Sequence, residues 1–145
     1  MCQYLRILFL TLAACLFLSG RTEPAIAETL WSHNNSVMRF SYIGDLDDFQ
    51  ITYEKPKESL QAAGVENGTV LIEGIRKGDR LTGTANRFSA SCRAPLEYAV
   101  AGQIIRESRI VLRGRREVYD RNCRPTGRWV TDNLVFEFIS EEPEQ

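Results

Sequence analysis

Histidine, lysine and long apolar segments are scarce in this chain of 145 residues. The only histidine is His33, which excludes sites built from several histidines and makes His33 the one available base for a serine hydrolase. The longest apolar run, from Ile7 to Leu18, is interrupted only by Thr11. Its 12 residues fall short of the about 20 that a membrane-spanning helix needs.

The first 27 residues have the order of a secretory signal. Arg6 gives a basic start, the apolar run follows, and residues 25–27 supply the small residues of a cleavage site before Glu28. Two alternatives stay open: residues 12–15 have the form of a bacterial lipobox that would place a lipid on Cys15, and the segment could remain as an uncleaved anchor. We predict cleavage after Ala27, hence a periplasmic or secreted protein with no transmembrane span after cleavage.

Cysteines are few, and cleavage after Ala27 would leave two of the four, Cys92 and Cys123. An even pair in an oxidising compartment predicts a disulfide. Two cysteines and His33, which is distant in sequence, do not form a four-ligand set with the spacing of a zinc site. We therefore predict neither a metal site nor a cofactor.

A basic excess is also lacking, since 18 basic and 19 acidic residues give a formal net charge of −1. Domains that bind nucleic acid usually carry a basic patch and a high isoelectric point, so we predict no nucleic-acid partner. The choice of basic residue is uneven. Only Lys55, Lys57 and Lys77 are lysines, and all the others are arginines.

After Ala27, short runs of alternating apolar and polar residues are separated by turn residues, a pattern typical of half-buried strands. Strand-like runs cover residues 29–33, 37–43, 49–54, 69–76, 80–88, 96–105 and 109–119, with a last pair over 128–131 and 134–139. Residues 56–63 are the one helical stretch, with Pro56 at its first position and Gly64 as its cap.

This spacing predicts one all-β domain over residues 28–140, followed by an acidic tail at residues 141–145. The expected fold is a small antiparallel β-barrel or sandwich of about seven or eight strands with one short helix and one disulfide. We favour the barrel because an up-and-down meander needs only local pairings.

Residues 31–36 bring together the reactive side chains of Ser32, His33 and Ser36. Neither serine lies in a Gly-x-Ser-x-Gly elbow, and Trp31 and His33 share one face of the predicted strand, as an aromatic packing pair would. We therefore predict no catalytic residue here, and a hydrolase that uses His33 is the less favoured alternative.

Three acidic residues, Asp45, Asp47 and Asp48, lie within a predicted turn over residues 44–48. Solvated turn formers explain them best. A calcium site is the alternative, but the segment lacks the full spacing of an EF-hand loop.

Arginines gather between residues 93 and 128, where nine arginines accompany four acidic residues. In the predicted strand over residues 109–119, alternation places Ile110 and Leu112 inside and Arg109, Arg113 and Arg115 on the outer face. Guanidinium groups bind carboxylates and phosphates through paired hydrogen bonds. These three arginines are therefore candidate ligand-binding residues for an anionic glycan, a lipid head group or an acidic protein surface. The alternative is a solvated face paired with acids from neighbouring strands.

Several short motifs occur in a fixed order along the chain. They are Trp31-x-His33-Asn34-x-Ser36-x-Met38, Ala63-Gly64-Val65, Gly68-Thr69-x-Leu71, Gly78-Asp79-Arg80, Gly83-Thr84-Ala85, Cys92, Leu112-x-Gly114-Arg115, Cys123 and Leu134-Val135-Phe136. In this order they resemble a family of exported, small-domain proteins of alphaproteobacteria whose function is unassigned. The resemblance covers nearly all of the chain after residue 27. It implies a bacterial envelope setting, supports the disulfide and implies no activity.

The sequence thus predicts an exported, non-enzymatic binding or interaction module of the bacterial envelope, without naming its ligand. A structural envelope protein with a stoichiometric protein partner is the main alternative. The hydrolase that would use His33 is the weaker one.

Overall fold

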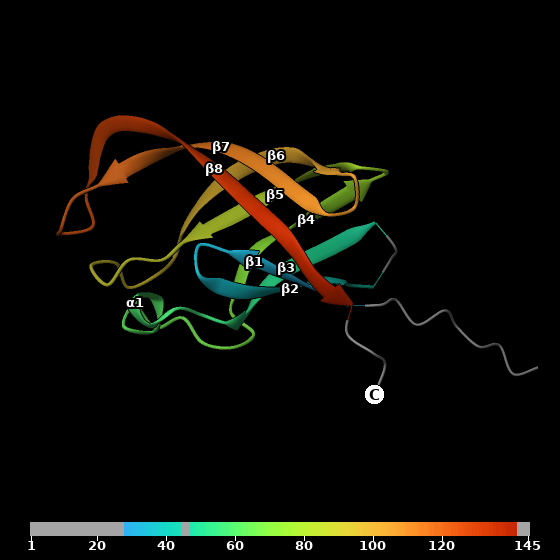
Figure 1. Cartoon of the computed structure of the whole chain (residues 1–145). Coiled ribbons are helices and arrows are strands. Elements are labelled where there is room, and N and C mark those ends of the chain that lie inside the picture. Colours follow the sequence, from blue (N-terminus) through green and yellow to red (C-terminus); the bar gives the residue numbers. More distant parts are fainter. Residues whose placement is uncertain (1–27, 45–46, 142–145) are drawn as a thin grey trace, which may run out of the picture.

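The computed structural model describes residues 28–44 and 47–141, which fold into a closed antiparallel β-barrel (Figure 1). The eight strands of this described part are β1 (Thr29–His33), β2 (Ser36–Tyr42), β3 (Asp48–Lys55), β4 (Val70–Lys77), β5 (Arg80–Arg87), β6 (Leu96–Ile105), β7 (Arg109–Tyr119) and β8 (Pro125–Glu141). Each strand pairs with the next along the chain, and β1 pairs with β8 to close the barrel. The short helix α1 (Glu58–Gln61) connects β3 to β4. The prediction of an all-β barrel is confirmed.

Some predicted features lie outside the described residues. These are the signal segment over residues 1–27 with the alternative lipid site Cys15, the turn residue Asp45, and tail residues 142–145. Within the ranges that are described, no helix has the length and apolar character needed to cross a membrane.

The predicted disulfide between Cys92 and Cys123 is confirmed. Cys92 lies in the loop between β5 and β6, and Cys123 lies in the loop between β7 and β8. Figure 1 shows these two loops and α1 at the same end of the barrel. We call this end, at which β1, β3, β5 and β7 finish, the mouth.

Alternation along each strand decides which side chains fill the barrel. On β7, Ile110 and Leu112 are fully buried, whereas Arg109 and Arg113 on either side of them are exposed. The largest fully buried side chains are Phe49, Phe136, Met38, Ile51, Ile72 and Leu81. These aromatic and aliphatic groups make the barrel interior a packed core rather than an open channel.

Glycines at inward positions let the strands of this barrel approach and coil. Gly102 on β6 pairs with Leu81 on β5 and with Leu112 on β7, so it lies in one row between two fully buried leucines. A Cβ atom on Gly102 would lie 1.8 Å from the carbonyl oxygen of Val111. A larger residue at this position would therefore force β6 and β7 apart.

The predicted pair of C-terminal strands is wrong, because β8 continues without a turn from Pro125 to Glu141. Asp132 and Asn133 are turn-forming residue types, but they remain in the ladder and pair with Gly114 and Arg113 of β7. Arg116 contacts the Asp132 carboxylate at 2.5 Å. This ion pair compensates the charge of an inward-facing acid, and the strand can continue through it.

Helix α1 is shorter than the helical stretch predicted over residues 56–63. Pro56 lies one residue before the N-cap residue Lys57, not at the first helical position. After the single turn, Gly64 adopts a φ of +83° and its amide donates to the carbonyl of Gln61 at 2.9 Å. Only glycine adopts such a φ without strain, so Gly64 ends the helical segment as predicted.

Candidate functional site

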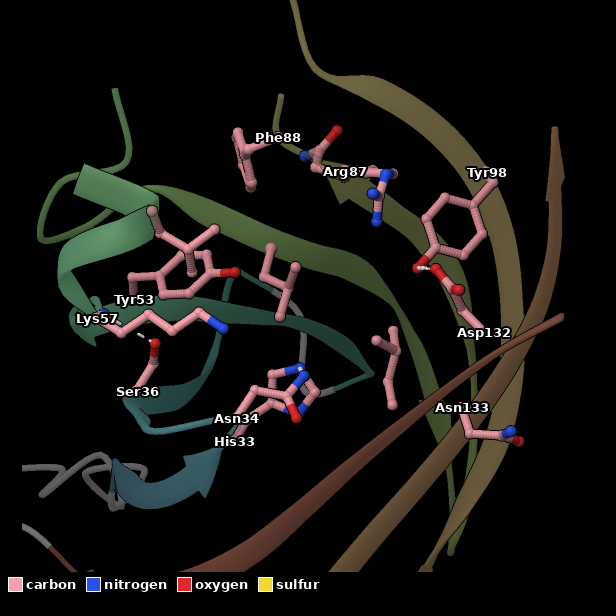
Figure 2. Close-up of a pocket in the computed structure, with 14 residues that line it drawn as sticks. His33, Asn34, Ser36, Tyr53, Lys57, Arg87, Phe88, Tyr98, Asp132 and Asn133 are labelled. Carbon is pink, nitrogen blue, oxygen red and sulfur yellow. Dashed lines mark hydrogen bonds between the residues drawn. The ribbon is translucent and has the colours of Figure 1, made fainter. Parts of the chain in front are cut away.

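A cavity of about 260 Å³ opens at the mouth of the barrel. Leu60 of α1, Leu71 of β4 and Leu134 of β8 provide part of its apolar wall. The lining side chains with a titratable group are His33, Tyr53, Lys57, Arg87, Tyr98 and Asp132. Figure 2 shows that they reach the cavity from different strands and from the segment that precedes α1.

Most of these residues continue the inward rows of the core to the end of the barrel. Tyr53 follows the buried Ile51 by two positions on β3, and Arg87 follows the buried Ala85 by two positions on β5. Because strand side chains alternate between the two faces, both side chains point inward at the mouth. The strands thus change from apolar to polar residues where the core ends.

The Asp132 carboxylate is held by two donors. Arg116 donates from Nε at 2.5 Å, and the Tyr98 hydroxyl donates at 3.1 Å. The side chains of Arg116 and Asp132 are only 15% and 23% exposed, so solvent screens their attraction less than that of a surface pair. Burial, and then the negative charge of Asp132, raise the pKa of Tyr98 well above its ordinary value, which keeps the phenol protonated as a donor. The negative charge of Asp132 is therefore already compensated by Arg116 within the protein.

Two further cations extend into the cavity from different sides, Lys57 and Arg87 (Figure 2). The backbone amide of Lys57 donates to Ser36 Oγ at 3.0 Å, which fixes the start of the Lys57 side chain beside β2. Neither cation forms a salt bridge with any residue in the described ranges. With Asp132 compensated by Arg116, the mouth has a net positive charge.

The hydroxyl of Tyr53 also points into the cavity (Figure 2). Burial raises the pKa of Tyr53 to about 12, so the phenol is protonated and can donate a hydrogen bond at any physiological pH. The cavity therefore combines two positive charges with a neutral donor. This set of groups favours negatively charged ligands.

His33 is held as a neutral, structural side chain. Its Nδ1 lies 2.8 Å from the carbonyl oxygen of Val135, so Nδ1 carries the proton and Nε2 accepts from the Asn34 side chain at 3.1 Å. The ring stacks on Phe136 with a centroid distance of 4.5 Å. Burial lowers the pKa of His33; the hydrogen bond to Val135 opposes this in part, and the nearby charge of Lys57 adds to the lowering. The predicted packing role is consistent with these contacts, although its aromatic partner is Phe136 across the barrel seam and not Trp31.

Neither serine near His33 forms a hydrogen bond with its ring in the described structure. Ser36 Oγ accepts the amide of Lys57, and Ser32 Oγ donates to the carbonyl of Glu137 at 3.5 Å. With both ring nitrogens already occupied, His33 is not positioned to take a proton from either hydroxyl. The geometry therefore does not favour the hydrolase alternative.

The buried neutral His33 predicts a loss of stability in mild acid. The unfolded chain takes up a proton on His33 near the ordinary pKa of about 6.5, whereas the folded state stays neutral to a lower pH. The unfolding free energy should therefore fall as the pH drops from about 7.5 to 5.5, by at most about 1.4 kcal/mol for each pH unit. Urea denaturation across this range should show this slope, and His33→Gln should remove it.

The slope in this pH range can be assigned to His33 because the sequence contains no second histidine. Ordinary carboxylates titrate mainly below about pH 5 and contribute little in this window. A His33→Gln variant that keeps the full slope would show that His33 has the same proton affinity in the folded and unfolded states.

The three arginines proposed from the sequence do not line the cavity. Arg109, Arg113 and Arg115 are exposed on the outer face of β7, as alternation predicts. Arg109 pairs with Glu137 of β8 at 2.9 Å, with both side chains about half exposed. Their role in ligand binding stays a prediction, and Arg109 has the neighbouring acid that the alternative of a solvated, paired face requires.

Sequence reasoning considered His33 and Ser36, which line the cavity, but missed its other titratable residues. A signal was available for four of them: Tyr53 and Arg87 follow a core residue by two positions, and Tyr98 and Asp132 precede one by two positions. No comparable signal marks Lys57, which lies outside the strands.

Comparisons with protein-family models, with curated proteins and with solved structures find no match for this chain. The resemblance to exported proteins of alphaproteobacteria therefore stays a prediction. The function has to be argued from the geometry of the mouth.

Proposed function

We propose that this protein is an exported, non-enzymatic binding module that holds a small anionic ligand in the mouth of its barrel. One observation carries the proposal: Lys57 and Arg87 extend into the same cavity and have no acidic partner among the described residues. Two unpaired cations in one concave site repel each other, and an anion placed between them relieves that repulsion.

The chemistry of the walls limits the ligand to a carboxylate or phosphate group on a small body. Lys57 and Arg87 supply charge-assisted hydrogen bonds, and the Tyr53 hydroxyl supplies a neutral one. The apolar side chains of Leu60 and Phe88 line the same space and suit an aliphatic or aromatic portion. At about 260 Å³ the cavity is smaller than the typical range of about 300–1,000 Å³ for drug-sized ligands.

Export is supported by two independent features. Residues 1–27 have the order of a secretory signal, and the Cys92–Cys123 disulfide suits an oxidising compartment such as the periplasm. The proposal of a binding module rather than an enzyme is supported by the hydrogen bonds of His33, which occupy both ring nitrogens and leave neither Ser32 nor Ser36 paired with it.

Titration with benzoate, octanoate and inorganic phosphate tests this proposal. We expect at least one of these anions to bind, and the Lys57→Gln/Arg87→Gln double variant to bind it about a hundredfold more weakly. Each lost charge-assisted hydrogen bond costs roughly 1.5–3 kcal/mol, or about tenfold or more in affinity. Lys55→Gln is the matched control, because Lys55 is exposed at the end of β3 and does not line the cavity.

Calorimetry and ligand-observed nuclear magnetic resonance would measure these affinities. Binding that survives the double variant, or that Lys55→Gln weakens equally, would contradict the assignment of the mouth. If the protein converts any of these probes, the non-enzymatic part is wrong. Purification with a stoichiometric protein partner and no affinity for any of the anions would instead support the structural role.

A further inference from the structure

A second charged surface lies outside the barrel, independent of the mouth. It consists of Arg113 and Arg115 on β7 and Trp129 on β8, and we call it the Arg–Trp strip. All three side chains are on the outer face, and all three are exposed. We propose that the Arg–Trp strip docks an extended acidic segment of a partner protein, in which carboxylates occur at alternate positions.

The arginines of the strip form no salt bridge with any described residue, unlike Arg39, Arg109 and Arg116. Arg109, on the same face of β7, lies opposite Glu137 and pairs with it at 2.9 Å. Arg113, by contrast, lies between Ala101 of β6 and Asn133 of β8. Opposite charges that face each other across strands stabilise a sheet, and Arg113 has no acid at either cross-strand position.

Arg115 is likewise without an acid directly opposite, because its partner on β8 is Thr131. Glu117, two positions further along β7, accepts the amide of Gly127 at 2.8 Å and is thereby engaged with the β7–β8 loop. No salt bridge connects Arg113 or Arg115 to any residue in the described ranges. Two guanidinium groups are thus available for an external anion.

Trp129 adds an apolar contact area beside these charges. Its side chain is 53% exposed, whereas the other tryptophan of the chain, Trp31, is buried. The guanidinium carbon of Arg115 lies 5.6 Å from the centroid of the Trp129 ring, close enough for a cation–π interaction that orients both groups. Exposed tryptophan and arginine side chains are the residues most enriched at the energetic centres of protein interfaces.

Spacing favours a peptide over other polyanions. Arg113 and Arg115 are two residues apart on one strand, so their Cα atoms are about 7 Å apart. In an extended peptide, acidic side chains at alternate positions repeat at the same distance and point to the same side. β7 and β8 pair with each other along the strip, so a partner that docks on the face of these two strands contacts their outer side chains.

The strip offers its own spectroscopic probe. Trp129 is exposed and Trp31 lies in the core, so a ligand on the strip should change mainly the fluorescence of Trp129 and protect it from acrylamide quenching. We would titrate the protein with a short synthetic peptide in which glutamate alternates with threonine. A peptide of equal composition with its glutamates in one block is the spacing control.

We expect the alternating peptide to bind at least about tenfold more tightly than the block peptide, and binding to weaken with salt. Arg113→Gln/Arg115→Gln should reduce its affinity by about tenfold or more. Arg109→Gln is the matched variant on the same strand, already paired with Glu137, and should change the affinity by about twofold at most. Thermal unfolding of each variant confirms that it is folded.

Equal binding of the two peptides, or unchanged binding by the double variant, would overturn the proposal. Tighter binding of a heparin fragment than of the alternating peptide would assign the strip to a sulfated glycan and would equally overturn it. The Lys57→Gln/Arg87→Gln variant should bind the peptide normally, so failure at the strip and failure at the mouth are distinguishable.

Discussion

Replacing both Cys92 and Cys123 by serine is expected to lower the unfolding free energy by about 3–4 kcal/mol. The two cysteines are separated by 31 residues, and their bond restricts the unfolded chain over that whole loop. In the chain-entropy treatment a closed loop of this length gives a stabilisation of that size. This is a large share of the about 5–15 kcal/mol by which native domains are stable.

The same double variant should also bind a small anion at the mouth more weakly. The disulfide joins the β5–β6 loop, which follows Arg87 and Phe88, to the loop that closes β7 and β8. Without this link the end of β5 is less restrained, and the Arg87 guanidinium is held less firmly against the cavity. We expect the affinity for a small anion to fall along with the stability, since a ligand must then order the loops on binding.

Urea denaturation of the wild type, of the double serine variant and of the wild type under reducing agent measures the stability effect. The two disulfide-free samples should agree with each other, which separates loss of the bond from any effect of the serine side chains. Equal stability of all three samples would show that the bond does not stabilise the fold.

Gly102→Ala is expected to destabilise the barrel by about 3 kcal/mol or more, a large effect for the addition of one methyl group. The added Cβ would lie 1.8 Å from the carbonyl oxygen of Val111 and 2.8 Å from the Cα atom of Leu112. Both contacts are with backbone atoms of β7, so no rotation of a side chain can relieve them. Strands β6 and β7 would have to separate and disturb the row of buried leucines around Gly102.

The matched control for this prediction is Ala101→Val on the same strand. Ala101 points outward and is exposed, so additional methyl groups there meet solvent, and the stability should change by no more than about 0.5 kcal/mol. Chemical denaturation of the two variants checks the comparison. A Gly102→Ala variant as stable as the wild type would mean that β6 and β7 can shift without loss of packing.

Much of the fold follows from local pattern. The strands predicted over residues 109–119 and 96–105 agree with β7 and β6 to the residue. Residues 128–131 and 134–139 were predicted as two strands, because Asp132 and Asn133 between them have the composition of a turn. Local preference favoured a turn there, and the ion pair of Asp132 with Arg116 favours a continuous strand.

Less of the candidate binding sites could be predicted from the sequence. Alternation placed Arg109, Arg113 and Arg115 on one outer face, and the structure has them there. It did not indicate that Arg109 pairs with Glu137, which lies 28 positions further along the chain by their residue numbers. Nor did it indicate that the cross-strand partners of Arg113 are Ala101 and Asn133. Which arginines are compensated depends on strand register, and register is a property of the paired sheet.

The sequence by itself determined the class of fold, the Cys92–Cys123 disulfide and the side of β7 on which Ile110, Leu112 and the three arginines lie. These depend on composition and on a period of two residues, which are local properties of the chain. Only the tertiary structure decided that Lys57, Arg87 and Asp132 share one cavity and that Asp132 alone of these is compensated by an ion pair. The physical reason is barrel closure, which brings together strand ends that are distant in sequence and sets each charge beside partners that no local pattern specifies.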